Sequence, residues 1–173
     1  ETAQLLADDL GVKLEVVPVS GANRVPFLLA NKADIVIASF SITEERKKVV
    51  DYSKPYGVVP VVVSAPKSAT LASTADLAGK NVAVARGTTA DIELTRAVKE
   101  AGAAANIVRY EDEATANTAI ATGQQDVLAA ALSTANSVAE QSPDKNLEVK
   151  LTLAAYPMAV GLRKNDPELK AWI

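Results

Sequence analysis

The chain contains no histidine and no cysteine among its 173 residues. These two absences exclude a His or Cys nucleophile, a Ser-His-Asp triad, an ordinary zinc site and a disulfide. The glycine fingerprints of nucleotide and dinucleotide loops are missing as well, so we expect no cofactor and no metal. What remains is binding, or catalysis by carboxylates, lysine, arginine and hydroxyl groups.

Aromatic residues are also scarce, and the chain has neither an excess of positive charge nor a long apolar run. Only 4% of the residues are aromatic, and Trp172 and the four tyrosines are too scattered to form a stacking platform for bases or sugars. A net charge of −3 lacks the basic stripe that a nucleic-acid partner requires. No apolar run approaches the roughly 18 residues of a membrane span, and the run at residues 58–63 has only the length of a strand.

Short strand-like segments alternate with short helical ones along the chain. We expect strands at residues 12–17, 34–39, 58–64, 81–85, 107–110, 126–130, 148–153 and 159–163. We expect helices at residues 1–10, 24–31, 44–49, 90–101, 114–122, 134–141 and 166–173. This alternation is typical of α/β folds with mostly parallel sheets and helices on both faces. A segment rich in Ala, Ser and Thr at residues 65–74 divides the pattern, so we predict two lobes.

The end of the strand at residues 34–39 is the first candidate binding site. It runs into Ser39-Phe40-Ser41, and a helix capped by Thr43 follows at once. Ligands of parallel α/β sheets lie beyond the carboxyl ends of strands, and a helix N-terminus there favours an anion. Arg46, one turn into this helix, suits bidentate carboxylate binding. The alternative is that Ser41 and Thr43 only cap the helix and that Arg46 pairs with a surface carboxylate: Glu44, Glu45 or Asp51.

Two further segments at the starts of helices are candidates for anion binding. Gly87-Thr88-Thr89 lies between a strand and a helix, and its backbone N–H groups suit a carboxylate or phosphate, although a simple capped turn explains it equally. It lacks the Gly-Lys-Ser/Thr core of a nucleotide loop. Arg24 opens a helix after Asn23, where a cation opposes the helix dipole and needs a partner. That partner is either a carboxylate of the chain or one of a ligand.

Taken in order, several segments resemble the solute-binding proteins of amino-acid ABC importers, the polar-amino-acid-binding family. They span nearly the whole chain: 23–26 (NRVP), 33–46 (ADIVIASFSITEER), 51–56 (DYSKPY), 77–84 (LAGKNVAV), 87–89 (GTT), 123–126 (GQQD) and 161–164 (GLRK). The resemblance implies a type II periplasmic-binding-protein fold, in which two α/β lobes joined by hinge strands close on a ligand. It places lobe 1 at residues 1–63 and 156–173, incomplete at both ends, lobe 2 at 67–153, and the hinge strands near 62–66 and 153–160.

The resemblance also implies roles for individual residues. Arg46 would hold the α-carboxylate of the ligand bidentately, helped by the backbone N–H groups of Ser41 and Thr89. The remaining residues that it places at the ligand are Ser39, the Ala38 carbonyl, Phe40 and Thr88 as neighbours, and Arg24, which in the acidic-amino-acid branch of the family reaches a side-chain carboxylate.

One position departs from the family pattern. After the Gly-x-x-Asp segment the family usually has an aspartate that pairs with the α-ammonium of the ligand, and here that position is Ala131. An unpaired buried ammonium is costly. Three explanations follow: an acid from the preceding chain takes its place, Ser133 and carbonyl groups suffice, or the ligand has no α-ammonium.

The function that the resemblance implies is capture of an amino acid or related small carboxylate for an ABC importer. Such a protein works as a monomer without catalysis, docks on a membrane permease and contacts no nucleic acid. It is periplasmic, or lipid-anchored outside a Gram-positive cell. Two alternatives remain: an enzyme on the same scaffold, such as a cyclohexadienyl dehydratase, and the ligand-binding sensor domain of a receptor. The enzyme needs a general acid in the cleft, and no Asp or Glu falls at the strand ends 39–41 and 86–89.

Overall fold

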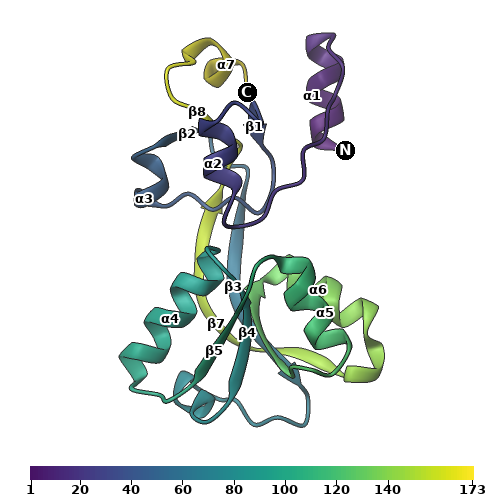
Figure 1. Cartoon of the computed structure of the whole chain (residues 1–173), viewed down its shortest axis with the longest axis vertical. Helices are drawn as coiled ribbons and strands as arrows, with labels where there is room; N and C mark the ends of the chain where they lie inside the picture. The colour runs from purple at the N-terminus through teal and green to yellow at the C-terminus, as the bar shows by residue number, and fades with distance from the viewer. The chain divides into compact units, whose positions relative to one another are not determined.

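The computed structural model describes all residues 1–173, and the chain divides into two compact units (Figure 1). Unit 1 comprises Glu1–Val19, Asn23–Gly57 and Pro157–Ile173, and unit 2 comprises Ser20–Ala22 and Val58–Tyr156. The expected α/β class is confirmed. Residues 58–63, which the family resemblance placed in the first lobe, group with unit 2. A hinge role for residues 62–66 and 153–160 stays a prediction.

Unit 2 is built on a five-stranded sheet with the order β5-β4-β6-β3-β7. The strands are β3 (Gly57–Pro66), β4 (Asn81–Ala85), β5 (Asn106–Tyr110), β6 (Val127–Ala131) and β7 (Leu147–Met158). The helices are α4 (Thr89–Ala101), α5 (Glu113–Ala121), α6 (Leu132–Gln141) and the 3₁₀ turns η1 (Thr74–Leu77) and η2 (Pro143–Lys145). Strand β4 pairs in parallel with β5 and β6, as expected, whereas β3 pairs with β6 in antiparallel.

The core of unit 2 follows from the alternation of side chains along its strands. Val82 and Val84 point to one face of the sheet, where they pack with Leu94 of α4. Ala83, between them, points to the other face, where it packs with Ile120 of α5. The helices therefore cover both faces, with α4 on one side and α5 and α6 on the other (Figure 1).

Unit 1 holds a small sheet with the order β1-β8-β2, whose pairings are antiparallel rather than parallel. Its strands are β1 (Ile35–Val36), β2 (Val50–Tyr52) and β8 (Gly161–Arg163). Its helices are α1 (Thr2–Leu10), α2 (Arg24–Leu29), α3 (Glu44–Lys47) and α7 (Pro167–Trp172). The core gathers around Phe40, which is fully buried against Leu28, Val36, Val50 and Tyr52.

Two strand predictions in unit 1 are wrong. Residues 12–17 form no strand, because they pair with no other segment and most of their side chains are exposed. The strand expected at residues 34–39 is only Ile35–Val36, because the chain then bends into a loop whose single bridge pairs Ser41 with Met158. The Ser-Phe-Ser segment therefore lies in this loop and not at the end of a long strand.

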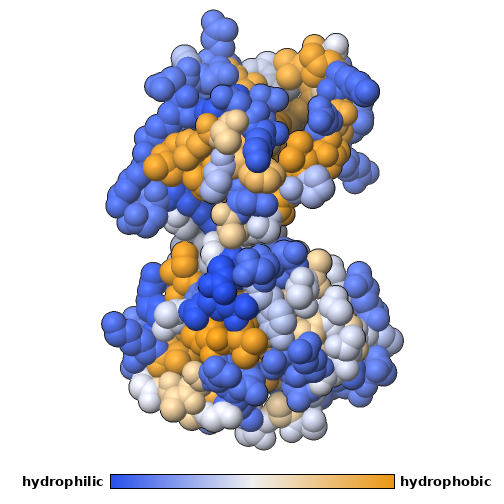
Figure 2. Space-filling view, viewed as in Figure 1, coloured by the Kyte–Doolittle hydropathy of each residue, from blue (hydrophilic) through white to orange (hydrophobic).

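The surface of unit 1 keeps apolar side chains exposed, among them Leu5, Leu10 and Val16. Figure 2 shows such apolar patches among hydrophilic residues on the face in view. No helix of the chain combines the length and the apolar character needed to cross a membrane.

Candidate functional site

Arg46 is fixed over the loop at residues 39–41 by two contacts. Its Nη1 donates to the Ser41 carbonyl at 3.0 Å, and its guanidinium lies 4.9 Å from the centre of the Phe40 ring. The backbone amide of Arg46 donates to Thr43 Oγ1 at 3.1 Å, which confirms Thr43 as the helix cap. A guanidinium carries five N–H donors in a planar fork, so a bond to a carbonyl on one side is compatible with bidentate carboxylate binding on another.

The three carboxylates that offered a surface partner for Arg46 are each paired with a lysine. Lys47 contacts Glu44 at 2.9 Å, Lys48 contacts Glu45 at 2.7 Å and Lys170 contacts Asp51 at 2.9 Å. Two of these lysines follow Arg46 directly in the chain and the third lies in α7, whereas Arg46 itself donates to the loop.

Tyr52 supports the same loop, and the sequence pattern gave it no role in the candidate site. Its hydroxyl donates to the Ser41 carbonyl at 3.1 Å, and its ring lies 5.2 Å from that of Phe40. Burial raises the pKa of Tyr52 to about 12, and the charges of Arg46 and Arg24 lower it by less. Two donors, the phenol and a guanidinium, thus hold one carbonyl of the loop in place.

Arg24 joins the other end of the loop. It is the first residue of α2 and is 6% exposed, and its Nη1 donates to the Ser39 carbonyl at 3.3 Å. Asn23 occupies the N-cap position, but its side chain makes no capping hydrogen bond. The hydroxyl of Tyr56 reaches the Ala38 carbonyl at 3.3 Å. We call Arg24, Ser39, Ser41 and Arg46 the arginine cluster.

Burial increases along the loop, and Ser41, like Phe40, is 0% exposed. Phe40 is fully buried in the core, whereas Ala38 and Ser39 are half-buried. Glycine at position 161 makes room for the ring, since a Cβ atom there would lie 2.3 Å from Phe40 Cε1. Phe40 thus acts as the anchor of the loop and as the platform for Arg46.

In unit 2, the Gly-Thr-Thr turn (Gly87, Thr88 and Thr89) connects β4 to α4. Thr88 is the helix cap: its hydroxyl accepts from the Asp91 amide at 3.2 Å and donates to the Ala85 carbonyl at 2.8 Å. Both threonines are 7% exposed, and Gly87 has a φ of 74° that favours glycine. The capped-turn interpretation is therefore confirmed, and a ligand role for the turn stays a prediction.

Asp91, which the sequence pattern did not single out, already places a carboxylate at this helix start. Its Oδ2 accepts the Gly87 amide at 3.2 Å, and its Oδ1 accepts Arg109 Nε at 2.8 Å. Arg109 is also bound to Thr95 Oγ1 at 2.8 Å. Part of the predicted anion cradle is thus satisfied by the chain itself.

Ala131 ends β6 and precedes α6, with no side-chain cap. Strand β6 runs parallel to β4, so Ala131 and the Gly-Thr-Thr turn lie at the same edge of the sheet. The methyl group of Ala131 offers no charge to an ammonium. Ser133, the suggested substitute, is exposed.

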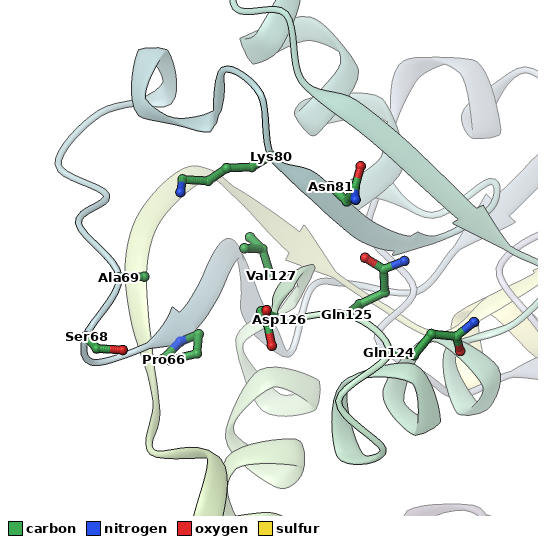
Figure 3. Close-up of a pocket in the computed structure, with 9 residues that line it drawn as sticks. All are labelled: Pro66, Ser68, Ala69, Lys80, Asn81, Gln124, Gln125, Asp126 and Val127. Atoms are coloured by element: carbon green, nitrogen blue, oxygen red, sulfur yellow. The ribbon is translucent and has the colours of Figure 1, made fainter.

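A cavity of about 550 Å³ lies in unit 2 where β4 and β6 begin, at the opposite edge of the sheet from the Gly-Thr-Thr turn. Figure 3 shows Lys80 and Asn81 from the start of β4, and Gln125 and Asp126 from the segment before β6, around it. It contains none of the predicted site residues. No group of three or more acidic side chains is arranged to hold a metal ion.

Residues 1–173 match the family model of bacterial extracellular solute-binding proteins, family 3. The glutamine-binding protein of Geobacillus stearothermophilus is 30% identical over 153 residues, which are 88% of this chain and 56% of that protein. An ancestral arginine-binding protein bound to arginine shares 29% identity and a TM-score of 0.88, covering 98% of this chain and 75% of that one. An ancestral amino-acid-binding protein, a precursor of cyclohexadienyl dehydratase, shares 33% identity and a TM-score of 0.83, covering 99% and 73%. The chain spans 56% to 66% of the length of four curated relatives that it matches.

Proposed function

The chain belongs to family 3 of the bacterial extracellular solute-binding proteins, and on this basis we propose that it binds a small carboxylate-bearing solute, first of all an α-amino acid, for an ABC importer. Arg46 and Arg24, the residues Ala38 to Ser41, Thr88, Thr89 and Ala131 are the proposed ligand contacts. The partner is a membrane permease, and the place of action is outside the cytoplasm.

The geometry of Arg46 carries this proposal. Its guanidinium is positioned by the Phe40 ring, 4.9 Å away, and by the hydrogen bond to the Ser41 carbonyl. Pre-ordering of this kind lowers the entropy cost of gripping a ligand carboxylate. The relatives named for glutamine and for arginine bind ligands that share an α-carboxylate and differ in the side chain.

We propose binding without catalysis. The carboxylate of Asp91, which contacts the Gly-Thr-Thr turn, is bonded to Arg109 and to the Gly87 amide. A general acid has to reach the proton that it transfers. We therefore expect a cyclohexadienyl acid to remain unchanged when it is incubated with the chain and followed by ultraviolet absorbance; turnover would contradict this part of the proposal.

A matched ligand panel tests the proposal. Each of L-glutamine, L-arginine and L-glutamate is compared with its α-keto acid and with its α-amide in thermal-shift and calorimetric titrations. We expect compounds with a free α-carboxylate to stabilise the chain and the amides to have little effect. Stabilisation by the keto acids as well would identify a simple carboxylate as the ligand class, consistent with Ala131. Equal stabilisation by acids and amides would contradict the proposal.

A further inference from the structure

Three residues, Ser20–Ala22, group with unit 2 although the chain on both sides of them groups with unit 1. They lie against the Gly-Thr-Thr turn. A Cβ atom on Gly21 would be 2.5 Å from Thr88 Cγ2, 3.2 Å from the Arg86 carbonyl oxygen and 3.3 Å from the Thr88 amide nitrogen. A Cβ atom on Gly87 would be 3.3 Å from Ala22 Cα. The two backbones therefore pass each other in close contact, with a glycine on each side.

Thr88 has little freedom to yield to a larger residue at position 21. It is 7% exposed, and its hydroxyl is bound both to the Ala85 carbonyl at 2.8 Å and to the Asp91 amide at 3.2 Å. These two bonds fix its χ1 angle and hence the place of its methyl group. Glycine at position 21 is thus the residue that lets the segment seat on the turn.

We propose that Ser20–Ala22 is a clasp on the Gly-Thr-Thr turn and that Gly21 is a positioning residue for ligand binding; this inference rests on the proposed function. Arg24 follows Ala22 by two residues, which span at most about 7 Å of chain. Arg24 begins α2 and donates to the Ser39 carbonyl at 3.3 Å. The clasp thus packs on the turn that carries the proposed ligand contacts Thr88 and Thr89, and the chain continues from it to Arg24 by a very short covalent path.

The absence of cysteine from the chain allows a direct test of the contact. In the double variant Gly21→Cys/Thr88→Cys, the new side chain at position 21 meets the side chain at position 88, within the reach of a disulfide. We expect oxidised glutathione to cross-link the two thiols within one chain in the absence of ligand, with loss of two hydrogens by mass spectrometry. The two single variants are the controls. A double variant that folds but does not cross-link would overturn the clasp.

The coupling to ligand is tested by affinity. We expect Gly21→Ala to weaken the binding of L-glutamine or L-arginine by about tenfold, because the added methyl unseats the clasp. Gly102→Ala is the matched control: Gly102 has a φ of 61° and nothing within 4 Å of an added Cβ, so it lowers the Tm and leaves the Kd unchanged. An unchanged Kd for Gly21→Ala would overturn the coupling.

The cross-linked variant keeps this test valid if Gly21→Ala does not fold. We expect its oxidised form to bind the amino acid more tightly than its reduced form, and equal affinities would overturn the coupling. The cross-link forms without ligand, so its outcome is independent of the proposed function. If the unaltered chain binds no carboxylate at all while the cross-link forms, the proposed function fails and the clasp contact stands.

Discussion

The arginine cluster of unit 1 and the Gly-Thr-Thr turn of unit 2 differ in the groups that their arginines contact. Arg24 and Arg46 donate to neutral carbonyls of one loop, at Ser39 and Ser41. At the turn, the carboxylate of Asp91 is matched by the guanidinium of Arg109 at 2.8 Å. The negative charge of Asp91 is thus matched by an arginine of the same unit. We propose that unit 1 recognises the anion of the ligand and that unit 2 contributes shape and hydroxyl groups.

The largest expected effect is that of Arg46→Ala. We expect this substitution to lower the affinity for carboxylate ligands by at least about 100-fold, because it removes the charge and both hydrogen bonds of a bidentate contact. Circular dichroism should show an unchanged fold. Lys48→Ala, an exposed neighbour paired with Glu45, is the control and should leave the affinity unchanged. An affinity for Arg46→Ala equal to that of the unaltered chain would remove Arg46 from the site.

Tyr52 makes the arginine cluster sensitive to high pH. Its pKa is about 12 in the folded chain, against an ordinary value of 10.0 for tyrosine. Only the unfolded state ionises between these values, so this contribution is fully present below pH 10 and is lost as the pH rises through 12. The loss reaches up to about 3 kcal/mol of unfolding free energy. Denaturant titrations at pH 9 and pH 11.5 measure it.

Tyr52→Phe isolates this contribution from those of Tyr56 and Tyr156, whose pKa values burial also raises. The variant should lose stability less steeply over the same pH interval. A slope identical to that of the unaltered chain would show that the phenol at position 52 is not the group responsible.

Asp91→Asn removes the charge pair between Asp91 and Arg109 at the Gly-Thr-Thr turn. The side chain of Asp91 is 11% exposed, so we expect a loss of about 2 kcal/mol of unfolding free energy when Arg109 loses its partner. The amide still accepts the Gly87 N–H, so we expect the affinity for carboxylates to change by less than about threefold. Asp112→Asn, at the exposed cap of α5, is the control with little effect on either quantity. A 100-fold loss of affinity in Asp91→Asn would contradict the proposal that unit 1, and not unit 2, recognises the anion.

Arg24→Ala has the smallest expected effect in free energy, and it separates the role of Arg24 from that of Arg46. We expect dicarboxylates such as L-glutamate to bind about tenfold more weakly, because one of two guanidinium groups is lost. Ligands with a single carboxylate should change little, since Arg46 remains. Calorimetry with L-glutamate and L-glutamine compares the two classes directly. Equal weakening of both would deny Arg24 a role in discrimination.

The sequence predicted unit 2 well because its signals are local. The strand at residues 81–85 and the helix ending before Gly102 were found as expected, since β-branched runs and a glycine in the left-handed conformation mark them. The segment at residues 12–17 carries a similar apolar pattern but has no partner strand, and pairing is a property of the whole fold. Its pattern alone was therefore misleading.

The candidate site was predictable where it depends on helix starts and less so where it depends on pairing. Thr43 and Thr88 cap their helices as their positions indicate. Which of three adjacent cations takes which carboxylate cannot be derived from spacing alone, because neighbours on a short helix are nearly equivalent. Asp91 and Arg109, 18 residues apart, meet only because β4 and β5 pair.

A double comparison of ligand and protein tests the central claim most directly, with L-arginine and L-argininamide titrated by calorimetry into the unaltered chain and into Arg46→Ala. The claim that unit 1 recognises the anion predicts that the unaltered chain prefers the acid by at least about 100-fold. It predicts that the variant binds acid and amide equally weakly. A variant that still prefers the acid by the same factor would show that the carboxylate is held elsewhere.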